Sequence, residues 1–234
     1  MNDTLFTQLV AFATGMLLLT AVLQTWRRSL PAGVRLLMVQ GAALAGLVAV
    51  LGLRAGHQGV WVAAFVVLAV KAVLVPLTLL RSATATGETG ESGVDTHPIA
   101  GVLASAGLTM LAYVLSQPVI DAVRALAARD GSTVPPWAEA SARAVPVGLA
   151  LVLIGLSILL MRGTALSQLL GFLVLDNGIA TVALLTSGGL PLMVEFGVLL
   201  DVLLIILILR ALAARMRTEL GGTALEHLTE LRDG

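Results

Sequence analysis

Long apolar runs are the feature that most restricts what this chain can fold into. Seven such runs, each of about 20 residues, are bounded by charged residues, prolines or glycines. They are Leu5–Thr25, Arg35–Leu53, Gln58–Leu80, Pro98–Val119, Arg143–Met161, Thr164–Leu185 and Leu190–Leu209. A helix of this length spans the hydrocarbon core of a bilayer. The sequence therefore predicts an integral membrane protein with about seven membrane-spanning segments.

These segments are expected to be helices. Backbone groups find no water inside a bilayer, so only helices and closed barrels satisfy their hydrogen bonds there. Barrel strands are shorter and alternate between apolar and polar residues, a pattern that the seven runs lack. A composition of 58% hydrophobic and 12% charged residues agrees with extensive contact with lipid. The predicted fold is an all-α, polytopic transmembrane helical bundle.

The positions of the arginines predict the orientation of this bundle, because cytoplasmic loops carry an excess of basic residues. Most arginines fall on one side of the predicted spans, namely Arg27, Arg28, Arg35, Arg81, Arg162, Arg210, Arg215, Arg217 and Arg232. The others fall on the opposite side, namely Arg54, Arg124, Arg129 and Arg143. We therefore expect a cytoplasmic C-terminus, an N-terminus outside and a multi-pass protein of the cell (inner) membrane. Trp26 and Trp61 lie at predicted span ends, where aromatic residues are enriched.

Composition excludes several functions for this chain. The 14 basic residues balance the 14 acidic residues, so the basic surface that binds nucleic acid is missing. The sequence has no cysteine, which excludes iron–sulfur ligation, and its three histidines, His57, His97 and His227, are far apart. We expect no metal, no cofactor and no catalytic residue in this chain.

Three parts are predicted along the chain. Residues 1–142 form a four-helix membrane part with an external loop, residues 143–210 form a three-helix part, and residues 211–234 form a cytoplasmic amphipathic tail. The external stretch Ile120–Ala142 is expected to hold a short interfacial helix that a proline turn ends. The glycine-rich segment 81–97 contains acids that would repel phosphate, so it is predicted to be a flexible cytoplasmic loop.

Four ionisable residues inside the predicted spans are the candidate functional residues: Lys71, Asp176, Glu195 and Asp201. Each costs roughly 2.5–3.5 kcal/mol at the centre of a membrane helix, so each is expected to serve a function. At about 1.5 Å per residue, Lys71, Asp176 and Asp201 lie about 17–20 Å from one end of their spans, near mid-membrane. Glu195 lies only about 8 Å from the outer end.

Two interpretations of these residues remain open. Lys71 and one acid could form a structural ion pair that fixes the packing of two helices. Three acids against one lysine leave a surplus of carboxylates, however, and desolvation favours the protonated form of a carboxylate. A carboxylate in this position binds and releases protons. The sequence therefore predicts a proton path through Asp176, Asp201, Glu195 and Lys71.

Two local distortions are expected next to the charged residues. Pro76 lacks an amide hydrogen, so it disrupts the helix around Lys71 and frees the carbonyl of Ala72. Asn177 and Gly178 interrupt an otherwise apolar run directly after Asp176. A continuous or locally distorted helix is favoured there over two half-spans, which would be too short to cross the bilayer.

Four segments of the chain resemble one family of membrane proteins. They are residues 71–77, KAVLVPL; residues 168–178, QLLGFLVLDNG; residues 194–201, VEFGVLLD; and residues 225–232, LEHLTELR. Together these segments resemble component E of hydrogenase-4, a membrane subunit of formate-hydrogenlyase-type group 4 [NiFe]-hydrogenase complexes. The similarity covers essentially the whole chain.

The last three predicted spans also resemble the small three-helix subunit K of respiratory complex I and its counterpart in Mrp-type antiporters. Those subunits carry one glutamate in each of two adjacent helices on the proton path, and the corresponding positions here are Asp176 and Asp201. Aspartate is shorter by one methylene, which makes a water-bridged path more necessary than direct transfer between the acids. Glu195 has no counterpart in the three-helix subunit, but its spacing from Asp201 resembles component E.

The resemblance implies a non-catalytic subunit that contributes mid-membrane carboxylates to ion translocation. Its partners would be large antiporter-like membrane subunits and a hydrogenase-like peripheral module, with nickel, iron and iron–sulfur clusters in other polypeptides. Three alternatives remain open: a subunit of an Mrp-type or hydrogenase-free complex, a stand-alone secondary transporter with a midplane site, and a structural adaptor between larger subunits.

Overall fold

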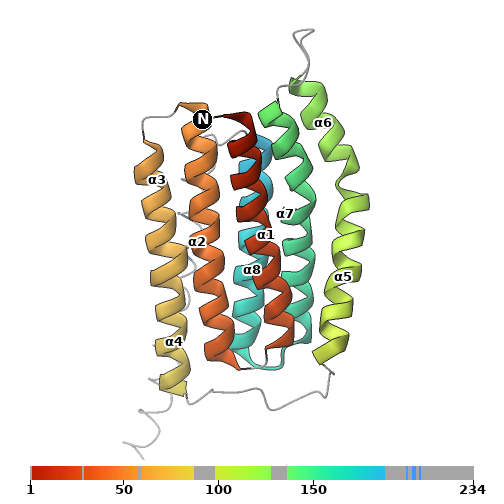
Figure 1. The fold of residues 1–234 in the computed structure, drawn as a ribbon. Helices are drawn as coiled ribbons and strands as arrows, with labels where there is room; N and C mark the ends of the chain where they lie inside the picture. Colours follow the sequence, from red (N-terminus) through yellow and green to blue (C-terminus); the bar gives the residue numbers. More distant parts are fainter. Residues whose placement is uncertain are drawn as a thin grey trace, which may run out of the picture.

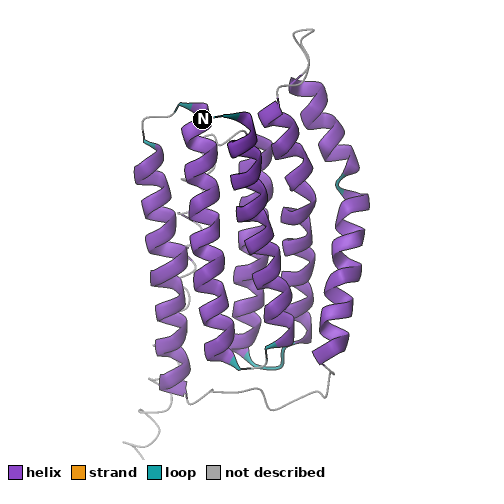
Figure 2. Cartoon of the chain, in the orientation of Figure 1, coloured by secondary structure: helices purple, strands orange, loops and turns teal. Residues whose placement is uncertain are grey.

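A computed structural model describes residues 2–27, 29–56, 59–86, 98–127 and 136–187, together with positions 199, 202, 203 and 206. These residues are almost entirely helical and include no strand, so the all-α prediction is confirmed for this part of the chain (Figure 2). Six helical segments in it are long and apolar enough to cross a membrane. They are Asp3–Trp26, Leu30–Ala55, Val60–Thr84, Ile99–Ala122, Trp137–Met161 and Ala165–Ser187. The chain is a multi-pass membrane protein.

The predicted seventh span, Leu190–Leu209, falls almost wholly outside the described residues. Positions 199, 202, 203 and 206 are helical, and the rest of that span is not described. The expected tail, residues 211–234, also lies outside the description, as does most of the predicted loop 81–97. A total of seven spans therefore stays a prediction.

Helices α1 (Asp3–Trp26) and α2 (Leu30–Ala55) form an antiparallel pair (Figure 1). The helix α2 begins five residues before the predicted Arg35, because proline is tolerated in the first turn of a helix and Pro31 lies there. At the other end of the pair, Arg54 Nη2 lies 2.6 Å from Asp3 Oδ1. Gly56 then ends α2 with a positive φ of 72°, a conformation that glycine adopts without strain.

The third span consists of three consecutive pieces. The α-helix α3 (Val60–Val67) runs into the π-helix η1 (Leu68–Leu74), which is followed by α4 (Val75–Thr86). The amide of Val75 donates to the carbonyl of Val70, five residues earlier, as the wider π turn requires. The π-helical segment lies directly before Pro76, where the sequence predicts a distortion. Proline has no amide hydrogen with which to continue the regular ladder.

The fourth span is α5 (Pro98–Leu115), and α6 (Gln117–Ala127) continues it after a single residue, Ser116 (Figure 1). The amide of Ile120 still donates to the carbonyl of Ser116, so helical hydrogen bonding resumes across the junction. The predicted interfacial helix therefore begins at Gln117 instead of Ile120 and is an extension of the fourth span. Pro118 follows the junction and explains it, because a proline nitrogen cannot donate to the preceding turn.

Helices α7 (Pro136–Met161) and α8 (Ala165–Ser187) form the most extensive helix pair (Figure 1). A Cβ at Gly178 would lie 2.6 Å from the backbone nitrogen of Val152 and 2.9 Å from the carbonyl oxygen of Gly148, so glycine permits this close approach. Helix α7 starts seven residues before the predicted Arg143, and proline again occupies its first turn. The predicted boundary between residues 142 and 143 consequently falls inside α7.

The two ends of the bundle carry different polar contacts. Arg162, between α7 and α8, donates from Nη2 to the backbone oxygens of Gln24, at 2.9 Å, and Arg27, at 2.7 Å. The α1–α2 and α7–α8 connections therefore lie together, at what we call the Arg162 end. The opposite end, where Asp3 binds Arg54, is called the Asp3 end. Large apolar side chains such as Phe12, Phe65 and Met110 are exposed on the outside of the bundle, as lipid contact requires.

Candidate functional site

The structure brings together two of the four predicted charged residues. Lys71 in η1 and Asp176 in α8 are far apart in sequence, yet Lys71 Nζ donates a hydrogen bond to Asp176 Oδ2. Their side chains are only 6% and 7% exposed, so the ion pair is buried. Glu195 and Asp201, the other two predicted members of the path, lie outside the described residues.

The ion pair lies near the middle of the bundle. Lys71 is about 16 Å from the start of α3, and Asp176 is about 16 Å from the start of α8, at 1.5 Å per residue. These two helices run in opposite directions, so both distances place the pair at mid-depth. A buried charge at this depth costs far more when it is unpaired than when it is paired. The Lys71–Asp176 contact supplies that pairing.

A second buried polar contact lies directly beside the pair. Asn177 Nδ2 donates to Gln40 Oε1 of α2 at 3.0 Å, and Gln40 Nε2 donates to the backbone oxygen of Leu17 in α1 at 3.3 Å. Gln40 is completely buried and Asn177 is 3% exposed. Thr181 Oγ1 donates to the carbonyl of Asn177 at 2.7 Å. These bonds link α1, α2 and α8 next to the charged residues.

The helix α8 continues as an α-helix through Asn177 and Gly178, so of the continuous and the locally distorted helix that the sequence favours there, the structure has the continuous one. The physical reason is that each residue has a role in packing. Asn177 finds its hydrogen-bond partner on α2, so its side chain does not compete with the backbone of α8. Gly178 provides the contact surface for α7.

Gly41 determines how closely η1 approaches α2. A Cβ at Gly41 would lie 2.6 Å from the carbonyl carbon of Lys71 and 2.7 Å from the amide nitrogen of Ala72. Only glycine therefore allows the backbone of η1 to lie at this position. Sequence reasoning did not single out Gln40 and Gly41, although a glutamine inside an otherwise apolar run is a signal that could have found them.

A small cavity of about 10 Å³ adjoins the ion pair. Its lining residues are Leu37, Lys71, Val75, Leu173 and Asn177. A volume of this size corresponds to roughly one water molecule. The cavity is therefore lined by one lysine and one asparagine as well as by three apolar residues.

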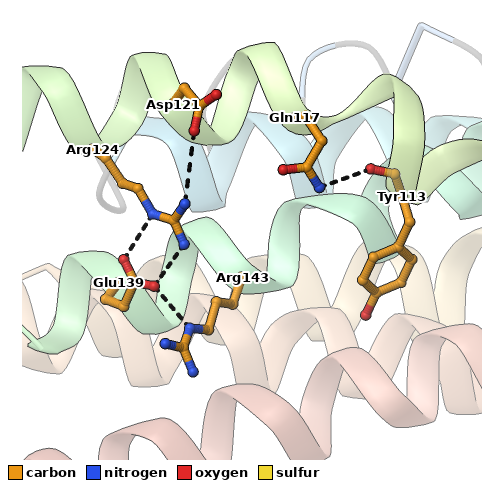
Figure 3. A network of polar contacts seen from close by, with 6 residues as sticks. All are labelled: Tyr113, Gln117, Asp121, Arg124, Glu139 and Arg143. Atoms are coloured by element: carbon orange, nitrogen blue, oxygen red, sulfur yellow. Dashed lines mark hydrogen bonds and ion pairs between the residues drawn. The ribbon is translucent and has the colours of Figure 1, made fainter.

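A separate polar network joins α6 to α7 (Figure 3). Glu139 accepts hydrogen bonds from Arg124 Nε at 2.9 Å, from Arg124 Nη2 at 2.7 Å and from Arg143 Nε at 2.8 Å. Asp121 Oδ1 lies 3.7 Å from Arg124 Nη1. The hydrogen bonds that Arg124 donates to Glu139 raise the pKa of Arg124 above its usual value. This network fixes the extension of the fourth span against α7 at the Asp3 end.

No group of three or more histidine, aspartate or glutamate residues that could hold a metal is found within the described residues. Charged side chains of the described residues meet instead at separate places. These include the Lys71–Asp176 pair at mid-depth, the Arg124–Glu139–Arg143 network and the Arg54–Asp3 pair. Only the first lies where a membrane would exclude water, so it is the candidate functional site.

Comparison with known proteins shows that the chain has a relative similar to it over its full length. The uncharacterized protein Rv0085 of Mycobacterium tuberculosis is 38% identical over 234 residues, and the alignment covers 100% of both chains. No protein-family model matches the chain. No solved structure matches it. The chain belongs to the family of the uncharacterized protein Rv0085.

Proposed function

We propose that this chain is a non-catalytic membrane subunit of a redox-linked complex and that its Lys71–Asp176 pair belongs to a proton path. The observation that carries the proposal is a buried ion pair at mid-depth in the membrane bundle. Charged residues inside membrane helices mark ion paths in many transport proteins. The π-helical segment around Lys71 adds support, because such segments occur frequently at functional sites.

The pair provides a simple mechanism for taking up and releasing a proton. A lysine ammonium next to a buried carboxylate favours the ionised carboxylate, and its withdrawal favours the protonated form. A charge that moves in a neighbouring subunit would attract or repel the Lys71 ammonium and so change its distance from Asp176. Asp176 would then bind a proton in one state of the complex and release it in the other.

The sequence resemblance supplies the context for this mechanism. The complex would be of the group 4 [NiFe]-hydrogenase and complex I type, with large antiporter-like membrane subunits and a hydrogenase-like peripheral module. Nickel, iron and iron–sulfur clusters would be held by these partners. Asp201 and Glu195 would extend the path from Asp176, the C-terminus would face the cytoplasm, and the complex would reside in the cell membrane.

The first experiment is affinity purification of the tagged chain from native membranes in mild detergent, with mass spectrometry of the partners and metal analysis. Recovery with antiporter-like subunits and a nickel–iron module supports the full proposal. Recovery with antiporter-like subunits but without nickel keeps the ion path and removes the hydrogenase. Recovery of the chain alone contradicts the proposal and favours a stand-alone transporter.

A structural adaptor is the second candidate. Lys71 and Asp176 bind each other, and the next residue, Asn177, is hydrogen-bonded to Gln40, so all four side chains can serve to hold the helices together. Asp176→Asn distinguishes the two functions. A proton-path residue predicts normal assembly of the complex and loss of redox-driven proton movement in vesicles. An adaptor residue predicts loss of assembly first. The matched control is Asp121→Asn, which makes the same change at an exposed position of α6.

A further inference from the structure

The surroundings of the Lys71–Asp176 pair differ between its two sides. Three apolar residues line the cavity, and each lies about one helical turn from a polar residue of the site. Leu37 lies one turn from Gln40, Val75 one turn from Lys71 and Leu173 one turn from Asn177. In each case the turn leads toward the Arg162 end, because α2 and α8 begin at that end and α4 terminates there. The cavity therefore adjoins the pair on its Arg162 side.

On the opposite side of the pair, the described residues belong to a packed part of the bundle. Val67 lies four residues before Lys71, and Leu44 lies four residues after Gln40; both belong to the large apolar core. Thr181 lies four residues after Asn177, is fully buried and donates its hydroxyl to the Asn177 carbonyl. These residues one turn toward the Asp3 end are therefore buried, and none of the three lines the cavity.

Hydroxyl groups continue on the Arg162 side of the cavity. Thr78 and Ser82 follow Lys71 by seven and eleven residues, which places them on the same face of the third span. Both are buried, and the Ser82 hydroxyl donates to the carbonyl of Thr78 at 2.9 Å. The Thr78 hydroxyl likewise donates to the carbonyl of Val75 at 2.7 Å, so both hydroxyl protons are used within their own helix. Their oxygens can still accept a hydrogen bond, and they are polar positions between the cavity and the Arg162 end.

We propose that the cavity binds a water molecule between Lys71 Nζ and the Asn177 amide, and that water reaches the ion pair from the Arg162 end only. The proposal rests on the proposed function, because this water would be the group that exchanges protons with the pair. Two polar partners and a volume of about 10 Å³ meet the minimum requirements for an ordered internal water. The closed Asp3 side would prevent protons from crossing the membrane without a change in the pair.

Matched cysteine substitutions test the direction of access, since the chain has no cysteine of its own. Val75→Cys and Val67→Cys change the same residue type four positions on each side of Lys71, and both valines are buried. The variants Leu37→Cys and Leu44→Cys repeat the comparison on α2, where the two buried leucines lie on either side of Gln40. Each variant is assayed as the full chain in native membrane vesicles. Ag⁺ is the probe, because it is small, membrane-impermeant and reacts with a hydrated thiolate.

After exposure to Ag⁺ for a set time, the protein is denatured and treated with a maleimide. A thiol that has bound Ag⁺ is not labelled, so the unlabelled fraction of this chain over time gives the rate of the Ag⁺ reaction. We expect Val75→Cys and Leu37→Cys to react at least tenfold faster than Val67→Cys and Leu44→Cys. The faster reactions should occur only in vesicles whose Arg162 end faces the medium, an orientation that labelling of Arg27→Cys identifies. Less than a tenfold difference in either pair, a reversed order, or no reaction at the cavity positions would overturn the proposal.

This experiment separates the inference from the proposed function. Ag⁺ access needs neither proton movement nor a redox partner, so it reports hydration of the cavity alone. If purification recovers no redox partner but the rates differ as expected, the proposed function fails and the one-sided water access stands. If the partners are recovered and the rates do not differ, the proposed function stands and this inference fails.

Discussion

The side chain of Asn177 donates a hydrogen bond of 3.0 Å to Gln40, one residue away from the carboxylate that binds Lys71. Two adjacent residues of α8 therefore contact two different helices. Asn177 binds Gln40 of α2, and Asp176 binds Lys71 of η1. Both contacts are buried, so neither exchanges easily with a contact to water. The position of the candidate site is set jointly by an ion pair and a neutral hydrogen bond.

The ion pair should show strong coupling between its two members. Lys71→Met leaves the Asp176 carboxylate buried without its cation, which costs about 3–5 kcal/mol for a typical buried pair. The double variant Lys71→Met with Asp176→Asn removes both charges and should recover most of that loss. Thermal unfolding of the purified proteins measures both effects. Equal stability of the single and double variants would show that the two residues do not depend on each other.

The close contact between α2 and η1 should be sensitive to one added methyl group. Gly41→Ala places a Cβ against the Lys71 backbone. We therefore expect the free energy of unfolding to fall by about 1–3 kcal/mol, the usual cost of overpacking. Gly46→Ala on the same helix is the matched control, because a Cβ there meets no atom within 4 Å. The control should be neutral or slightly stabilising, since alanine favours helices. Similar unfolding temperatures for the two variants would contradict the observed approach.

The amide pair should follow a different pattern from the ion pair. Gln40→Met leaves the Asn177 amide buried without its acceptor, at an expected cost of about 1–3 kcal/mol. Adding Asn177→Leu removes the amide that lost its acceptor and should restore most of the stability. Two apolar residues can pack against each other and leave no unpaired polar group from this amide pair. Thermal unfolding with a double-mutant cycle measures the coupling. Additive effects of the two changes would indicate that no such hydrogen bond forms.

The network between α6 and α7 should contribute little and should respond to salt. Glu139→Gln removes the carboxylate that two arginines share, Arg124 and Arg143. Because both arginines are partly or largely exposed, we expect a smaller fall in unfolding temperature than for Gly41→Ala. The difference from the unaltered protein should shrink as ionic strength rises, since salt screens exposed charges. An effect that is independent of salt would assign Glu139 a different role.

Much of the fold could be predicted from the sequence because membrane helices are defined by length and hydropathy. The first six predicted spans lie within the observed helices or nearly coincide with them. The errors occur where proline is involved. Pro31 and Pro136 lie in the first turns of helices that begin earlier than expected, and Pro118 follows a junction within a longer helical segment.

The candidate site could be predicted only in part. Lys71 and Asp176 were found from the sequence because a charge in an apolar run is costly and therefore conspicuous. Their pairing was one of two open interpretations, since sequence gives the depth of a residue but not the direction in which its helix faces. Gln40 and Gly41 were missed, because a neutral amide and a glycine disturb a hydrophobic run far less than a charge does.

The sequence by itself determined that this is a helical membrane protein, where the six described spans lie, and that Lys71 and Asp176 place charge at mid-depth. These properties depend on the energy of transferring each residue into lipid, and that energy is local. Only the tertiary structure decided that Lys71 binds Asp176, that Asn177 binds Gln40 and that a cavity opens on one side of the pair. Those contacts depend on the rotation and separation of α2, η1 and α8, which close packing at Gly41 and Gly178 sets.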